Sequence, residues 1–203
     1  MKSLSEIETT SKRATKAIGY SWGVSEEVGK SIRLLELFGL PGIKNLNQYY
    51  KDKEIKKFEN LNLISEKNQS NTSPFCPITL GIGFLDQIKL IESMEKITFN
   101  NVAYPIIFLS FISRASEVIG KKIYIKFDKN EFLLNLNVNI YSNYLDQQFI
   151  TIAKNIEVEF IENKDSFTEV EWKNLYKLSE NTFVDETESS KQGAAGAGLT
   201  DND

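Results

Sequence analysis

The chain contains no histidine among its 203 residues and only one cysteine, Cys76. The absence of histidine excludes histidine metal sites, histidine-containing catalytic triads, cysteine–histidine nucleophiles and the usual general base at neutral pH. A single cysteine excludes an internal disulfide, cysteine-based zinc sites and cysteine-ligated iron–sulfur clusters. Any catalysis must therefore use carboxylates, lysine, tyrosine, arginine, hydroxyl groups, Cys76 or a bound cofactor of unknown type.

Long hydrophobic runs are also absent. The longest extends from Tyr104 to Ile112 and is interrupted by Pro105 and Ser110, whereas a membrane-spanning helix needs about 20 apolar residues. No apolar segment of the signal-peptide kind precedes a small-residue cleavage site near Met1. With the single cysteine, these features predict a cytoplasmic protein that has no membrane partner.

The chain has no excess of basic residues. Its net charge is −4, and residues 185–203 carry five acidic residues and one basic residue, which leaves 23 of each sign in the rest of the chain. A nucleic-acid-binding surface needs a basic face with interleaved aromatic residues, and none is visible. We therefore expect the partner to be a small molecule or another protein and not a nucleic acid; the oligomeric state is not indicated.

Hydrophobic residues make up 41% of the chain and aromatic residues 11%, which is enough to build a core. The patterns predict an α+β fold with an N-terminal helical layer, a small, mainly antiparallel sheet, and a C-terminal helix plus tail. We expect one domain over residues 1–184, with a helical part at 1–62 and a sheet-containing part at 74–184, followed by an acidic, glycine-rich tail at 185–203. The predicted elements are three helices within residues 1–60, a strand at 78–84, helices at 85–94 and 104–119, strands at 122–128, 132–140 and 156–161, and a helix at 168–180.

The first group of candidate functional residues consists of Trp22, Glu26 and Glu27. Trp22 lies in the segment GYSWG between the first two predicted helices, and the glutamates follow Ser25, where the second helix is expected to start. In one interpretation the aromatic residue fills a helix corner and the glutamates complement the helix dipole. In the other, Trp22 lines a pocket and raises the pKa of a neighbouring carboxylate.

Arg114, flanked by Ser113 and Ser116, interrupts the apolar helix predicted at 104–119. An arginine in a largely buried helix must find a partner or reach solvent, because burying it unpaired is costly. It therefore serves either as a structural ion-pair donor or as a fork for a substrate carboxylate. Cys76 precedes Pro77 in an apolar stretch, and we expect a buried, inert thiol there.

The tail segment GAAGAGLTDND at residues 193–203 has a glycine spacing like that of phosphate-binding loops. No helix follows it to supply amide donors, so a nucleotide site is excluded. Two alternatives stay open for this segment. A docked tail offers Asp201 and Asp203 as oxygen ligands for Mg²⁺ or Ca²⁺, or as acid–base carboxylates; the other alternative is a solvated terminus.

Several segments together resemble a bacterial family known as a domain of unknown function. They are the residues 3–7 (SLSEI), 19–23 (GYSWG) with Glu26 and Glu27, 102–105 (VAYP), 188–191 (ESSK) and 196–203 (GAGLTDND). The resemblance implies that the tail belongs to the domain. Lys191 departs from it, because an arginine is expected there, and lysine lacks the bidentate fork that binds carboxylates. The family supplies no activity to carry over.

Two functional hypotheses follow. The first is a small-molecule metabolic enzyme of lyase or isomerase type that uses carboxylate and arginine chemistry. The second is a non-catalytic partner subunit or binding module whose tail docks on another protein. In the first hypothesis the catalytic residues are Glu26, Glu27, Arg114 and Asp201, and the substrate pocket is lined by Trp22, Ser113 and Lys191.

Overall fold

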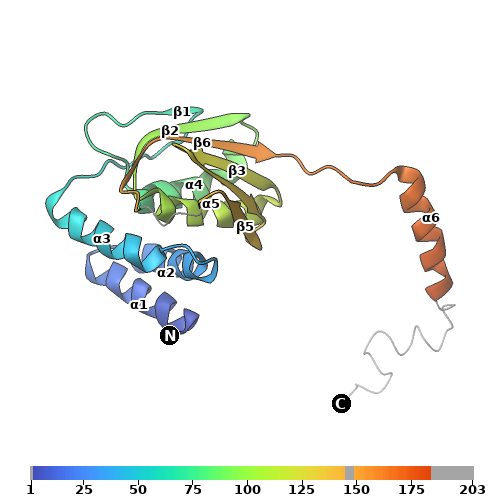
Figure 1. Ribbon diagram of the computed structural model, residues 1–203, viewed down its shortest axis with the longest axis horizontal. Helices are drawn as coiled ribbons and strands as arrows, with labels where there is room; N and C mark the ends of the chain where they lie inside the picture. Colours follow the sequence, from blue (N-terminus) through green and yellow to red (C-terminus); the bar gives the residue numbers. More distant parts are fainter. Residues whose placement is uncertain (1, 145–148, 184–203) are drawn as a thin grey trace, which may run out of the picture. The chain divides into compact units, whose positions relative to one another are not determined.

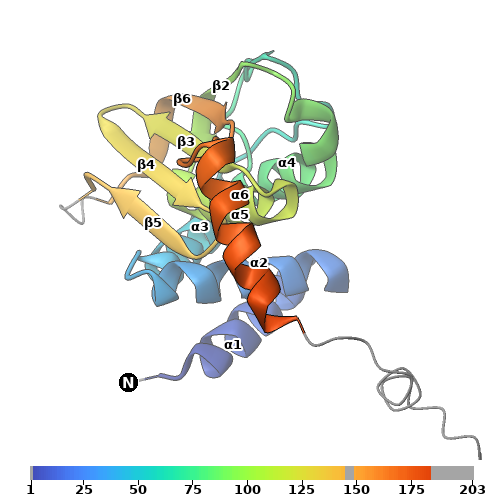
Figure 2. The ribbon, with the colours of Figure 1, turned by 90° about the vertical axis from the view of Figure 1, so that its right-hand side faces the viewer.

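The computed structural model describes residues 2–144 and 149–183. The chain divides into two compact units, Met1–Asn163 and Lys164–Asp203. In the first unit, Figures 1 and 2 both show two helices lying between a sheet and a layer of three further helices. The helices of this unit are α1 (Leu4–Ala17), α2 (Trp22–Leu37), α3 (Gly42–Ile55), α4 (Pro77–Ile91) and α5 (Pro105–Ile119). The strands are β1 (Lys67–Asn68), β2 (Lys96–Ala103), β3 (Lys122–Phe127), β4 (Asn130–Asn135), β5 (Asn139–Ser142) and β6 (Ile152–Ile161).

The three predicted N-terminal helices are confirmed, and the second begins at Trp22, before the predicted start at Ser25. A capping box between Ser3 and Glu6 opens α1. Ser21 caps α2 through a hydrogen bond from the amide of Val24. Because α2 begins at Trp22, Glu26 and Glu27 lie beyond its first turn, and the interpretation of these glutamates as first-turn dipole partners is wrong.

The sheet has six strands in the order β1-β2-β6-β3-β4-β5. Strand β6 is antiparallel to both of its neighbours, with Phe99 opposite Ile156 on the β2 side and Ile125 opposite Val158 on the β3 side. Strands β2 and β3 are therefore parallel to each other, and α5 connects them across the intervening β6. This arrangement is a split βαβ unit.

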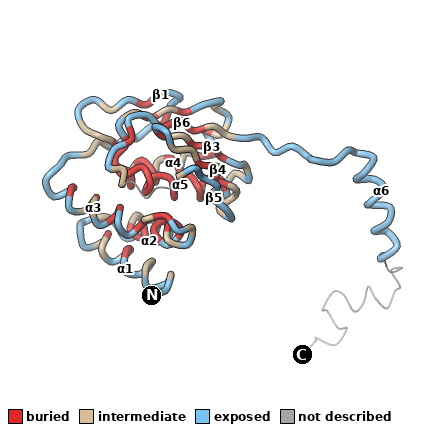
Figure 3. Tube along the Cα trace, in the orientation of Figure 1, coloured by how far each residue is buried: buried red, intermediate tan, exposed pale blue. Residues whose placement is uncertain are grey.

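One face of the sheet forms the core together with α4 and α5. Alternate residues of the strands, such as Phe99, Ile125 and Val158, have no exposed surface and point to the same side. Nearly all of α5 from Pro105 to Ser116 is buried, and Figure 3 shows buried residues along α4, α5 and the adjoining strands as well as on α2. The opposite face of the sheet carries charged side chains, including Lys96, which binds Glu157 at 2.9 Å. Such one-sided burial is typical of antiparallel sheets.

The strand predicted at 78–84 is wrong, because this segment is the first half of α4. Cys76 occupies the N-cap and Pro77 the first turn, where proline costs no hydrogen bond. Gly81 allows α4 to approach α5 closely: a Cβ at this position would lie 2.2 Å from the ring of Phe111. Gly81 therefore serves helix packing.

The strand predicted at 132–140 is two strands, β4 and β5, joined by a tight turn. Leu136 and Asn137 both have left-handed backbones, with φ of 50° and 60°, as a hairpin turn matched to the sheet twist requires. Two serines of α5 hold this turn. The hydroxyl of Ser116 accepts the amide of Leu136 at 3.0 Å, and the hydroxyl of Ser113 donates to Oδ1 of Asn137 at 3.1 Å.

The second unit contains α6 (Glu169–Ser179) and a short 3₁₀ turn, Glu180–Thr182. Thr168 caps α6 through a capping box with Glu171, and the rings of Phe167 and Trp172 stack with centroids 5.7 Å apart. Among the described residues, no helix is long and apolar enough to cross a membrane. The α+β fold, with an N-terminal helical region and a C-terminal helix, is confirmed.

Candidate functional site

Glu27 and Arg114, two predicted catalytic residues, are in direct contact. Arg114 Nη2 forms an ion pair with Glu27 Oε2, and Lys30 binds the other carboxylate oxygen at 2.9 Å. Burial opposes ionisation of Glu27, but the hydrogen bonds from Lys30 and Arg114 prevail and lower its pKa. Only 19% of the Arg114 side chain is exposed. The pair therefore links α2 to α5, which is the structural alternative considered for Arg114.

The other predicted residues that the structure describes do not join this pair. Glu26 binds Lys12 of α1 at 2.5 Å, and Trp22 is 56% exposed, with the Lys12 ammonium 5.7 Å from its ring centroid. Ser113 is engaged by the β4–β5 turn, as described above. Asp201, Asp203 and Lys191 lie outside the described residues, so a role for them stays a prediction.

A pocket of about 330 Å³ lies where the turn between α1 and α2, the end of α3 and the start of α4 meet. Three lysines line it, Lys53, Lys56 and Lys57, and none of its other described lining residues is acidic. We call it the basic pocket. Lys56 binds Asp52 at 2.7 Å. Lys53 and Lys57 have no carboxylate within ion-pair distance in the described part of the chain, and the Lys53 ammonium lies 5.0 Å from the ring centroid of Tyr20.

Tyrosine hydroxyls and a thiol form the inner wall of the basic pocket. The hydroxyls of Tyr20 and Tyr49 are 2.9 Å apart, and the Tyr49 hydroxyl lies 3.0 Å from Sγ of Cys76. Burial raises the pKa of both phenols, so both stay protonated and can donate hydrogen bonds. Cys76 is only 3% exposed, which confirms the expected buried thiol, and the amide of Thr79 donates to its sulfur at 3.5 Å.

A second pocket of about 350 Å³ adjoins the basic pocket and shares Lys56, Lys57 and Phe58 with it. Its other walls combine apolar and hydroxyl-bearing side chains with the carboxylate of Asp52. We call it the second pocket. Its lining includes Pro74, Ala103, Tyr104, Thr151 and Ile152.

Tyr104 joins the second pocket to α3. It precedes Pro105 at the start of α5 with a left-handed backbone, φ 45° and ψ 60°, a conformation that costs a residue other than glycine about 1 kcal/mol or more. Its hydroxyl donates to Asp52 Oδ2 at 2.6 Å. The hydrogen bond from Lys56, followed by that from Tyr104, lowers the pKa of Asp52. Asp52 is therefore an ionised carboxylate already bound by three donors, since Gln48 also donates to it at 3.3 Å.

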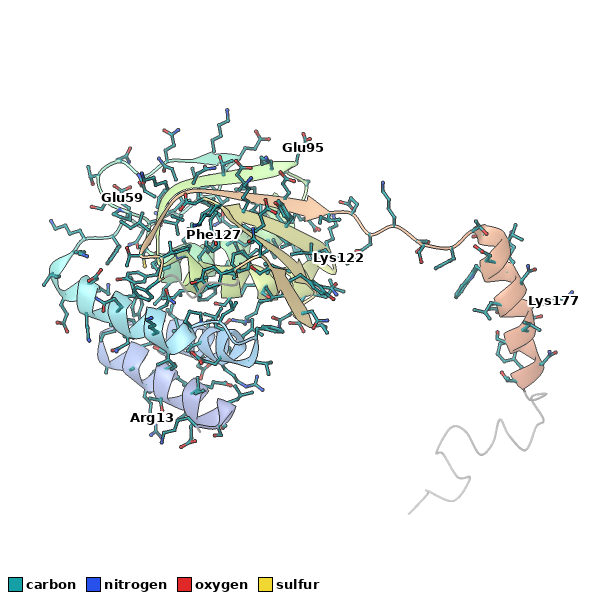
Figure 4. All side chains as sticks on the ribbon, viewed as in Figure 1. Arg13, Glu59, Glu95, Lys122, Phe127 and Lys177 are labelled. Atoms are coloured by element: carbon teal, nitrogen blue, oxygen red, sulfur yellow. The ribbon has the colours of Figure 1, made fainter. Side chains whose placement is uncertain are left out.

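Glu59 organises the walls of both pockets. Its carboxylate accepts hydrogen bonds from the amides of Asn71, Thr72 and Ser73, at 2.6 to 3.1 Å. These backbone donors lower its pKa to about 2. Its own backbone pairs with Pro74 and with the amide of Cys76. Figure 4 labels Glu59 between the end of α3 and the loop that it holds.

Sequence reasoning missed both pockets. The available signal was the charged run KDKEIKK at residues 51–57, but a charged run is most often a solvated helix face. Within residues 2–144 and 149–183, no group of three or more histidine, cysteine, aspartate or glutamate side chains is arranged to hold a metal ion. The chemistry that the described residues bring together is therefore that of lysines, neutral phenols and a thiol, which can bind and stabilise negative charge.

Of the comparisons with known proteins, the one with family models gives a match, in the N-terminal part of the chain. Comparisons with curated proteins and with solved structures give no match. All the residues that line the basic pocket lie between Tyr20 and Thr79, within the segment that a family model matches. Residues 2–80 match the family described as "Protein of unknown function (DUF3726)", so the resemblance to an uncharacterised domain family is confirmed for this segment.

Proposed function

We propose that the protein binds a small anionic molecule in the basic pocket. The observation that carries the proposal is the convergence of three lysines on a pocket that no acidic residue of the described chain lines, in a protein whose net charge is −4. Like charges held close together repel each other. An anionic ligand would offset this repulsion, since Lys53 and Lys57 have no carboxylate within 4 Å among the described residues.

The inner wall of the pocket supports the same ligand class. Protonated Tyr20 and Tyr49 offer hydroxyl groups, and the amino end of α4, at Cys76, is the positive end of a helix dipole. A carboxylate or phosphate is complementary to both features. The free thiol of Cys76 fits the cytoplasmic location predicted from the sequence, because thiols stay reduced there.

The pocket also offers groups for the enzymatic hypothesis. Lysine ammonium groups and phenol hydroxyls stabilise negative charge that develops on a bound substrate, as a lyase or isomerase requires. In this proposal the chemistry relies on lysine and tyrosine, in place of the predicted Glu27 and Arg114, whose charges neutralise each other. The ligand is a small molecule, so the basic pocket calls for no partner protein.

The test compares the wild-type protein with the double variant Lys53→Ala/Lys57→Ala. Thermal unfolding is followed with phosphate, acetate, citrate and, as ligands of opposite charge, small amines. A ligand at one hundred times its Kd adds about 2.7 kcal/mol of stability, which corresponds to a rise of roughly 5 °C or more in Tm for a chain of this size. We expect at least one anion, and no amine, to stabilise the wild-type protein.

The double variant should lose at least tenfold in affinity for that anion, because each charge-assisted hydrogen bond contributes about 1.5–3 kcal/mol. Lys129→Ala/Lys154→Ala removes the same charge from exposed positions outside the pocket and should bind like the wild-type protein. Equal binding by all three proteins, or no stabilisation by any anion, contradicts the proposal.

A further inference from the structure

The basic pocket and the second pocket share Lys56, Lys57 and Phe58 and differ in their remaining walls. The basic pocket alone contains a third lysine, Lys53, whereas the second pocket alone contains the apolar residues Pro74, Ala103 and Ile152, together with Asp52. A molecule that occupied both pockets would therefore meet all three lysines on the side of the basic pocket and additional apolar surface on the side of the second.

Phe58 lies at the boundary and is held in place by its neighbours. Its ring packs against that of Tyr49, with centroids 5.2 Å apart and planes tilted by 52°. A ring fixed in this way offers a flat apolar surface, and aromatic pairs contribute about 0.5–1.5 kcal/mol beyond the area that they bury. The boundary between the two pockets thus favours a planar group over a flexible chain.

The volumes agree with this division. Each pocket, at about 330 and 350 Å³, lies at the lower end of the range of about 300–1,000 Å³ typical of small-molecule sites. An aromatic ring is smaller than either pocket, since a cavity of about 150 Å³ holds benzene. A single substituted ring therefore fits the second pocket while its charged group reaches Lys57.

Asp52 excludes a second anionic group from the second pocket. Its carboxylate is ionised and buried, and it accepts hydrogen bonds from both Tyr104 and Lys56. A negative charge on the ligand near Asp52 would be repelled. The charged group is thus directed toward Lys53 and Lys57, and the uncharged part toward Ile152.

From these contacts we infer that the ligand of the proposed function is an arylated anion. Its carboxylate or phosphate lies among the lysines of the basic pocket, and its aromatic ring lies against Phe58 and Ile152 in the second pocket. The inference rests on the proposed function, because it assigns the second pocket to the same ligand. It adds the chemical class of that ligand and the residues that select it.

The experiment measures the affinity ratio between matched anions that differ only by a ring: phenylacetate against acetate, and phenyl phosphate against phosphate. In the wild-type protein we expect the aryl member of at least one pair to bind at least tenfold more tightly. The variants Ile152→Asn and Phe58→Leu should lower this ratio at least threefold while acetate and phosphate bind as before. Ile152 is 45% exposed, so its replacement keeps the fold even if that of Phe58 does not.

Lys53→Ala/Lys57→Ala serves as the complementary variant, since it should weaken both members of a pair and leave their ratio unchanged. A wild-type ratio near one, with acetate or phosphate still bound through the lysines, overturns this inference and leaves the proposed function standing. A high ratio that Ile152→Asn does not lower also overturns it, because the ring then lies elsewhere. Absence of binding by all four anions overturns both proposals.

Discussion

The Glu27–Arg114 contact and the basic pocket hold charge in the same compact unit in opposite ways. In the contact, one carboxylate and one guanidinium from α2 and α5 neutralise each other. In the pocket, lysines from the end of α3 converge, and only Lys56 has an acidic partner among the described residues. A neutralised pair stabilises helix packing, whereas like charges held together cost free energy, a cost typical of functional sites. Whether a charge has a partner, more than the charge itself, therefore distinguishes the structural contact from the proposed functional site.

The largest effect should come from a change that disturbs both regions at once. Gly81→Ala places a Cβ 2.2 Å from the ring of Phe111, where α4 packs on α5. Overpacking of this kind should lower the free energy of unfolding by about 3 kcal/mol, measured by urea denaturation. Because Cys76 and Thr79 begin the same helix, affinity for the anion should fall as well.

Gly23→Ala is the matched control. A Cβ at Gly23 meets no atom within 4 Å, so the substitution should leave stability unchanged or raise it by up to about 1 kcal/mol through helix propensity. If Gly81→Ala behaved like this control, the close approach of α4 to α5 would be refuted.

Breaking the Glu27–Arg114 pair should lower the stability of the fold without weakening anion binding in the basic pocket. Arg114→Met leaves the partly buried Glu27 with Lys30 as its remaining partner and should destabilise the fold by about 2 kcal/mol. This is less than the 3–5 kcal/mol typical of fully buried pairs, because both side chains are partly exposed. Anion affinity, measured by calorimetric titration, should stay within about twofold of the wild-type value.

Lys12→Met breaks the more exposed pair with Glu26 and should change stability by no more than about 0.5 kcal/mol. If Arg114→Met lost anion binding while circular dichroism showed an intact fold, Arg114 would take part in binding. The Glu27–Arg114 pair would then not be purely structural.

The smallest effect, confined to acid pH, concerns Glu59. Its pKa is lowered from 4.5 to about 2 in the folded protein, so its contribution to stability is present above pH 5 and is lost as the pH falls toward 2. The difference in unfolding free energy between the wild-type protein and Glu59→Gln should be widest above pH 5 and should close near pH 2. Urea denaturation at a series of pH values measures it.

Glu54→Gln provides the comparison, since Glu54 is exposed and binds no group in the described chain. Its stability should follow the wild-type curve throughout. A constant gap between the wild-type protein and Glu59→Gln at every pH would show that the amides of residues 71–73 do not depend on the carboxylate charge.

Local patterns predicted much of the fold correctly. The alternation of Ile123, Ile125 and Phe127 predicted β3, and the apolar run closed by Gly120 predicted α5, because each pattern is complete within one element. Strand β2 was missed because Asn100 and Asn101 interrupt its alternation. The segment 78–84 was misread as a strand because the role of Gly81 depends on Phe111, about thirty residues away in the sequence.

The candidate site was less predictable, because it also depends on contacts between residues that are distant in the sequence. Arg114 was recognised as needing a partner, but its sequence context does not reveal Glu27. The basic pocket requires Tyr20, the run 51–57 and Cys76 to meet, and no single segment shows more than an ordinary helix end or turn. Spatial convergence of this kind is a property of the tertiary structure alone.

The central position of β6 has a consequence for how the chain reaches its fold. Residues 152–161 follow every other strand in the sequence, yet they pair with both β2 and β3. Until they insert, the sheet exists as two halves, each with an unpaired edge able to associate with other chains. Insertion closes long loops and delays folding. Completion of the sheet, and with it the wall at Ile152, is therefore expected to be a late, rate-limiting event during which the growing protein most needs protection from aggregation.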